Sequence, residues 1–172
     1  KILINNRPVF MRGNLDCLHF PLTGYPSCDI QEWERIFRIY KSYGLNHVRF
    51  HSWCPPEAAF TAADRICIYI QAEVLWIDWW MSVVRKERPE MTTRGLPKGL
   101  GHNPSADKFV PEELQRMIEA YGNHPSFTML CIGNELGNSN FDIMQQWIKS
   151  LQEKDPRRLY AISTARKIMP AD

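Results

Sequence analysis

The stretch PSFTMLCIGNELG, residues 125–137, decides the fold and raises the question of function. Its apolar run, residues 127–132, shows no regular alternation of polar and apolar side chains, which is typical of a strand covered on both faces in a parallel sheet. An amide and a carboxylate, Asn134 and Glu135, follow this run. Ligands bind at the carboxyl ends of strands in parallel sheets and barrels, so the placement indicates a site. A cap on the following helix, or an ion pair with a nearby cation, explains Glu135 equally well.

Predicted strands and helices alternate along the rest of the chain. We predict strands at residues 9–12, 46–51, 67–73, 127–132 and 159–163, and helices at residues 30–44, 56–66, 111–122 and 141–153. The first of these helices has the clearest signals, because Asp29 stands at its cap, apolar residues recur at helical spacing and Gly44 ends it. Such alternation indicates right-handed parallel βαβ units.

Polar side chains stand where successive predicted strands end. They are Asp16, Arg49 with His51, Glu73, and Asn134 with Glu135. A β/α barrel gathers such residues at one face, which favours a barrel over a doubly wound open sheet. We therefore expect the α/β class and a (β/α)8 TIM barrel, of which residues 1–172 form a partial barrel with about five parallel strands and four helices.

The composition narrows the classes of partner. Lys and Arg number 21 against 19 for Asp and Glu, so we expect no nucleic acid partner and no attraction to an anionic membrane. The apolar segment 66–84 is interrupted by charged residues and predicts no membrane span. A half barrel would leave an unpaired strand edge, so we expect the chain alone to associate with further copies, as a homo-oligomer or an aggregate.

Neither a metal nor another cofactor is indicated. The five cysteines have irregular spacing without a Cys-x-x-Cys pair, and we expect free thiols. The histidines lack metal-ligand spacing, and no glycine-rich nucleotide motif follows a strand. Residues 81–108 form a long polar segment, which predicts a functional or a disordered loop. Trp76 is either a platform for a sugar ring or a core residue, and the same alternatives apply to Trp53.

Four stretches together resemble a known family of enzymes. They are NNRPVFMRGNLD (5–16), LNHVRFHSWCPPEAAFTAAD (45–64), IYIQAEV (68–74) and YGNHPSFTMLCIGNEL (121–136). In this order they resemble the catalytic barrel of glycoside hydrolase family 2, which includes β-galactosidases, β-glucuronidases and β-mannosidases. The resemblance implies a retaining hydrolase that acts on a β-linked carbohydrate substrate.

The resemblance also implies roles for individual residues. Glu135 matches the general acid/base, and Asn134 matches the residue that binds the hydroxyl next to the anomeric carbon. Arg49 matches an arginine that orients the catalytic carboxylates. His51, at a spacing of two from Arg49 on the same face of the strand, either lines the sugar site or is a packed histidine. Trp76 is a candidate for the sugar site, and Asp16 matches a polar sugar contact. Glu73 is a further candidate contact, one strand before Glu135.

One part of the family pattern has no counterpart in the chain. The nucleophile of the family is a second Glu on a later strand, and no residue up to Asp172 matches its motif, Glu73 included. We therefore expect residues 1–172 to be a fragment of a longer, multidomain enzyme, inactive alone. A non-catalytic carbohydrate-binding or structural remnant is the alternative. Localisation stays open, because the chain opens at Lys1 without a signal pattern, and a periplasmic or secreted location fits as well as any other.

Overall fold

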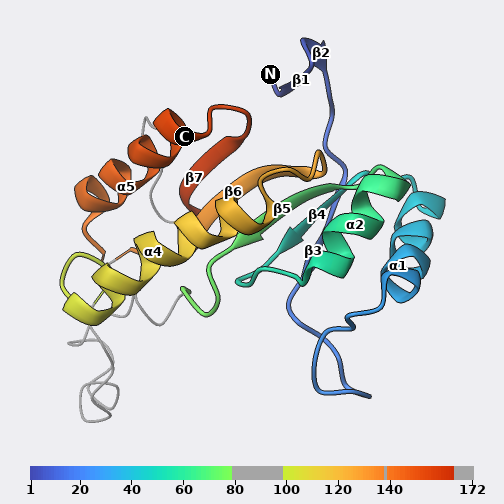
Figure 1. The fold of residues 1–172 in the computed structure, drawn as a ribbon, viewed down its shortest axis with the longest axis horizontal. Coiled ribbons are helices and arrows are strands. Elements are labelled where there is room, and N and C mark those ends of the chain that lie inside the picture. The colour runs from blue at the N-terminus through green and yellow to red at the C-terminus, as the bar shows by residue number, and fades with distance from the viewer. Residues whose placement is uncertain (79–98, 138, 165–172) are drawn as a thin grey trace.

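The computed structural model describes residues 1–78, 99–137 and 139–164 (Figure 1). Its centre is a parallel sheet of five strands: β3 (Gly13–Asp16), β4 (His47–Phe50), β5 (Tyr69–Glu73), β6 (Phe127–Asn134) and β7 (Leu159–Thr164). The helices are α1 (Ile30–Ser42), α2 (Glu57–Ile66), α4 (Pro104–Tyr121) and α5 (Phe141–Lys154). A short antiparallel hairpin pairs β1 (Leu3–Ile4) with β2 (Arg7–Pro8), and β1 lines a cavity together with residues of β6 and β7.

The strand order distinguishes the two parallel architectures. Each strand pairs in parallel with the next one in the chain, giving the order β3-β4-β5-β6-β7. A doubly wound sheet reverses its order at a switch point, and this sheet contains no reversal. The predicted partial barrel with five parallel strands and helices outside is therefore confirmed. The predicted association of copies stays a prediction.

The core lies between the sheet and the helices. Side chains from α1, α2, α4 and α5 pack against one face of the strands. The largest fully buried side chains of this core include Trp33, Phe37 and Phe60 from the helices, and Phe50 and Ile70 from the strands. Burial of side chains of this size contributes roughly 1.5–3 kcal/mol each. Arg49 and Glu73 alternate with core residues along β4 and β5, so they lie on the face of the sheet away from the helices.

The first strand of the sheet corrects the sequence prediction. Residues 9–12 are not a strand, and the parallel ladder begins at Gly13, which is paired with His47. The side chain of Asn46 replaces ladder bonds before that point, because its Oδ1 accepts from the N–H of Arg12 and its amide donates to the carbonyl of Phe10. A Cβ on Gly13 would lie 2.5 Å from the ring of His47, so the glycine allows the first two strands of the sheet to pack closely.

The helix predicted from Pro111 begins seven residues earlier, at Pro104. Asn103 caps it by accepting from the N–H of Ala106, and the Asp107 carboxylate accepts from the N–H groups of Gly101 and Asn103. The bond from Ala106 satisfies one donor of the first turn. The two bonds to Asp107 tie that turn to the residues before the helix. Residues 104–108, which were predicted to belong to the long loop, are therefore helical. Residues 81–98 of that loop lie outside the described residues. None of the described helices has the length and apolar character needed to cross a bilayer.

A close backbone contact holds the end of β6 against the segment after β5. The Asn134 N–H donates to the carbonyl of Ile77 at 2.9 Å. A Cβ on Gly133 would lie 2.0 Å from that same oxygen, so only glycine allows the approach. This contact fixes where the last residue of β6 lies.

Gly133→Ala is therefore expected to destabilise the protein that contains this chain by about 3 kcal/mol, at the upper end of overpacking costs. Gly24→Ala is the matched control, because Gly24 has a positive φ of 75° but open space around it. Its expected cost is about 1 kcal/mol, the penalty of the left-handed conformation. Chemical denaturation measures both, and equal losses would show that the contact with Ile77 is unimportant.

Candidate active site

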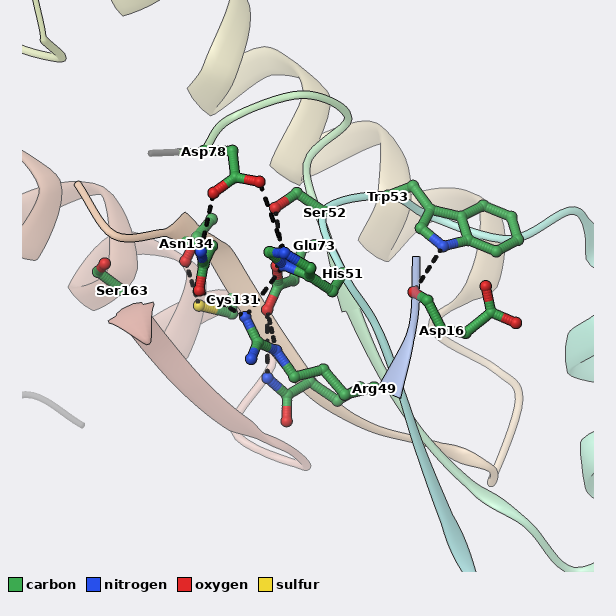
Figure 2. A network of polar contacts seen from close by, with 12 residues as sticks. Asp16, Arg49, His51, Ser52, Trp53, Glu73, Asp78, Cys131, Asn134 and Ser163 are labelled. Atoms are coloured by element: carbon green, nitrogen blue, oxygen red, sulfur yellow. Dashed lines mark hydrogen bonds and ion pairs between the residues drawn. The ribbon is translucent and has the colours of Figure 1, made fainter. Parts of the chain in front are cut away.

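Four structural elements bring polar side chains together at the carboxyl end of the sheet (Figure 2). Arg49 lies on β4, Glu73 is the last residue of β5, and Asn134 is the last residue of β6. His51 follows β4, and Asp78 lies in the segment after β5. Their convergence confirms that successive strand ends meet at one face. The roles of these residues stay predictions.

A buried ion pair forms the centre of this cluster. The Nε of Arg49 donates to the Glu73 carboxylate at 2.6 Å, and the Glu73 side chain is 0% exposed. Gln71 approaches the same oxygen at 3.5 Å. A carboxylate taken out of water needs both a counter-charge and hydrogen bonds, and Arg49 supplies both. Because it is buried, Glu73 can act on a ligand only through Arg49 and its neighbours.

The amide of Asn134 lies between two charged groups. Its Oδ1 accepts from the guanidinium of Arg49 at 3.0 Å, and its Nδ2 donates to the carboxylate of Asp78 at 2.8 Å. Rotating the amide by 180° would set an N–H against a cation and an oxygen against an anion. These two contacts define which way the side chain of Asn134 faces.

His51 lies beside two carboxylates. Its Nδ1 is 3.5 Å from Glu73 and its Nε2 is 3.6 Å from Asp78. The hydroxyl of Ser52 lies 3.2 Å from the same Nδ1. The imidazole therefore connects the ends of β4 and β5.

Glu135 lies immediately after β6, half-buried, with a positive φ of 52°. The cap of the next helix is Asn140, which accepts from the N–H groups of Asp142 and Ile143, so Glu135 is not that cap. The next residue, Leu136, is fixed by the hydroxyl of Ser163 on β7, which accepts its N–H at 3.1 Å. Glutamate in the left-handed region costs free energy, and such residues cluster at functional sites.

Asp16 belongs to a neighbouring group of contacts. Its carboxylate accepts from the N–H of Leu18 at 2.9 Å, and its carbonyl accepts from the indole of Trp53 at 3.2 Å. Burial raises the pKa of Asp16, partly offset by the Leu18 bond. Figure 2 shows Asp16 and Trp53 to one side of the cluster around Arg49. The side chain of Asp16 is thus near the site without joining that cluster.

A small pocket of about 140 Å³ opens between the ends of β3, β4 and β5. Its lining includes Leu18, His51, Trp53, Trp76 and Asp78. Trp76 is 66% exposed, which excludes the core alternative, whereas Trp53 is 3% exposed and belongs to the core. Ligand pockets usually measure about 300–1,000 Å³, so this pocket is smaller than a typical ligand site. Trp79 and Trp80 lie outside the described residues.

A larger cavity, about 670 Å³, lies at the opposite end of the strands, beside His124, Phe127 and Leu159. Barrel enzymes place their chemistry at the carboxyl ends of the strands. The candidate site is therefore at the smaller pocket and the polar cluster beside it. Within the described ranges, no three His, Cys, Asp or Glu side chains are grouped as a metal site would require.

A half barrel with amide, carboxylate and guanidinium groups at its strand ends has the features of the β/α-barrel enzymes. Residues 1–166 match the sequence family described as "Glycosyl hydrolases family 2, TIM barrel domain". The chain therefore belongs to this family.

Solved structures with the same fold include a β-glucuronidase from Parabacteroides merdae, at TM-score 0.70 and 20% identity over 94% of this chain and 19% of that one. A family 2 glycosyl hydrolase from Bacteroides cellulosilyticus matches at TM-score 0.71 and 22% identity, over 97% of this chain and 20% of that one. A Bacteroides uniformis β-glucuronidase, covalently bound to cyclophellitol-6-carboxylate aziridine, matches at TM-score 0.66 and 16% identity, over 92% and 18%. The chain spans about a fifth of the length of these proteins.

Asp78 is the member of the cluster that the sequence analysis did not single out. It stands five residues beyond β5, between an isoleucine and a tryptophan, in a segment whose pattern is mainly apolar. Its contacts with Asn134 and His51 depend on how that segment folds back over β6. In the sequence, the signal that could have pointed to Asp78 is its position as a lone carboxylate in an otherwise apolar run.

Removing Arg49 tests the buried ion pair. Arg49→Ala leaves Glu73 buried without its cation, and the expected loss of stability is about 3–5 kcal/mol. The matched control is Arg35→Ala, because Arg35 and Glu32 are also 2.6 Å apart but have side chains 60% and 40% exposed. That exposed pair should contribute at most about 1 kcal/mol. Urea denaturation of both variants measures the difference, and similar losses would contradict the importance of burial.

Proposed function

We propose that this chain is the first half of the barrel of a retaining glycosidase, with Glu135 as acid/base. The proposal depends on one observation above all: a buried strand ends at Asn134 in contact with Arg49 and Asp78, and Glu135 follows that strand end directly. Membership of family 2 supports glycoside hydrolysis as the reaction class. The substrate would be a β-linked sugar of the β-galactoside, β-glucuronide or β-mannoside type.

In this mechanism Glu135 donates its proton to the glycosidic oxygen while a second carboxylate attacks the anomeric carbon. The bond to the leaving group breaks, and a glycosyl-enzyme forms. Glu135, now a carboxylate, takes a proton from water, which attacks the same carbon and releases both sugar and nucleophile. We propose that the nucleophile lies beyond Asp172. A nucleophile of that kind agrees with the covalent aziridine complex of the Bacteroides uniformis enzyme.

The other residues of the cluster would hold the sugar and the acid in place. Asn134 would contact the hydroxyl next to the anomeric carbon, in the orientation that Arg49 imposes on its amide. Glu73 would hold Arg49 in place through the hydrogen bond that it accepts from Nε. Trp76 and His51, at the small pocket, would line one wall of the sugar site, with Asp16 nearby.

Glu135→Gln in the longer protein keeps the shape of the side chain but removes the proton. Hydrolysis of aryl glycosides with poor leaving groups should fall by roughly 10²–10⁴-fold. Substrates with activated leaving groups should lose much less in the first step, and azide should restore turnover by attacking the glycosyl-enzyme. Rates on galactosides, glucuronides and mannosides with both kinds of leaving group measure this. Glu153→Gln, exposed on α5, is the control and should change neither rate. Equal losses for both leaving groups would assign Glu135 a structural role.

The chain of residues 1–172 alone is expected to be catalytically silent. Double displacement needs two carboxyl groups about 5–5.5 Å apart, and a catalytic unit that lacks one member loses most of its rate enhancement. The assay compares this chain with the longer protein on the same aryl glycosides. Turnover by the chain that disappears in its Glu135→Gln form would reveal a second catalytic carboxylate within these residues. Silence of the longer protein as well would favour the non-catalytic remnant.

A further inference from the structure

The segment after β5 holds the end of β6 in two ways. Its backbone accepts the N–H of Asn134 through Ile77, and its side chain Asp78 accepts from the Nδ2 of the same residue at 2.8 Å. Gly133 allows this close approach, since any larger residue would meet the Ile77 carbonyl. Asp78 is therefore held by the fold at a fixed distance from the amide. Its side chain is only 14% exposed, so water screens the contact little.

Asp78 makes a short contact with Asn134. Its other carboxylate oxygen lies 3.6 Å from the Nε2 of His51, beyond hydrogen-bond distance. The 2.8 Å bond to Asn134 involves an ionised acceptor, and such bonds are roughly twice as strong as neutral ones. Arg49 holds the opposite end of the amide. A cation at the oxygen and an anion at the nitrogen leave the amide one favourable orientation.

We infer that Asp78 is a positioning residue that makes this site selective for sugars with a hydroxyl next to the anomeric carbon. It acts through Asn134, by holding the amide in the orientation that meets this hydroxyl. The inference rests on the proposed function, in which Asn134 makes that contact. Asp78 itself transfers no proton and forms no bond to the substrate.

The test uses two substrates of the longer protein, an aryl β-glycoside of the sugar it hydrolyses fastest and the corresponding 2-deoxy glycoside. Asp78→Ala should lower kcat/KM for the 2-hydroxy substrate by about 10- to 100-fold, the range for lost hydrogen bonds to charged groups. The 2-deoxy substrate has no such hydroxyl, so its kcat/KM should change less than about threefold. Asp78→Asn keeps an oxygen acceptor and should lose only about fivefold on the first substrate.

Asp64→Ala is the matched control. Asp64 also accepts hydrogen bonds at one end of β6, from the N–H of Ser126 at 2.9 Å and at 2.7 Å from His124. Because Asp64 lies at the far end of the strand, its loss should change kcat/KM for both substrates by the same factor. Equal losses on both substrates in Asp78→Ala, or no loss on either, would overturn the inference.

A second measurement separates this inference from the proposed function. If the longer protein hydrolyses neither substrate, the proposed function is overturned. Hydrogen exchange of the Asn134 side-chain amide then tests whether Asp78 holds that amide. With ¹⁵N-labelled asparagine, and Asn134→Ala to assign the signal, hydrogen exchange of this amide is measured. Exchange should quicken by about tenfold or more in Asp78→Ala, because the bond to the carboxylate is lost. Unchanged exchange would show that Asp78 does not hold the amide.

Discussion

The buried carboxylate of Glu73 is the constraint on which the candidate site depends. A charge with no exposed surface must be compensated where it lies, and Arg49 on the neighbouring strand is the cation that does so. Once Arg49 is held there, its Nη2 donates to Asn134 at the end of β6. A single ion pair thus links three strand ends into one rigid group. The same bonds that stabilise the sheet orient the residues proposed to meet the sugar.

Sheet register explains why these side chains meet. Arg49 is paired with Gln71, so Glu73 extends two residues beyond it, and Glu73 is paired with Cys131, so Asn134 extends three further. Each strand therefore presents its polar end a little farther along than the last. Because side chains alternate between the faces of a strand, a slip of one residue would separate Arg49 from Glu73 and bury a charge without a partner.

Hydrophobic pattern and polar strand ends were sufficient to predict the architecture and the meeting of Arg49 with Asn134 at one end of the sheet, because these depend on local sequence. The first strand was misplaced at residues 9–12, since its start depends on the contact of Gly13 with the ring of His47 in another strand. The start of α4 was misplaced because Asp107 bonds back to Gly101, a contact that helix propensity does not encode. Asp78 was missed for a similar reason. Its role depends on a tertiary contact with Asn134, and one carboxylate in an apolar run does not indicate which residue it contacts.

Glu135 is the strongest case for function in the geometry itself. A positive φ of 52° suits glycine, and the chain has glycines two residues away on either side, at 133 and 137, yet places a glutamate here. The left-handed conformation costs roughly 1–2 kcal/mol for such a residue, and the helix that follows takes its cap from elsewhere. The neighbours on both sides are tied down, Asn134 to Ile77 and Leu136 to Ser163, so the conformation is imposed by the surrounding structure. A glutamate held in this unfavourable conformation, at the end of a rigid strand, is better explained by a chemical role than by a contribution to stability.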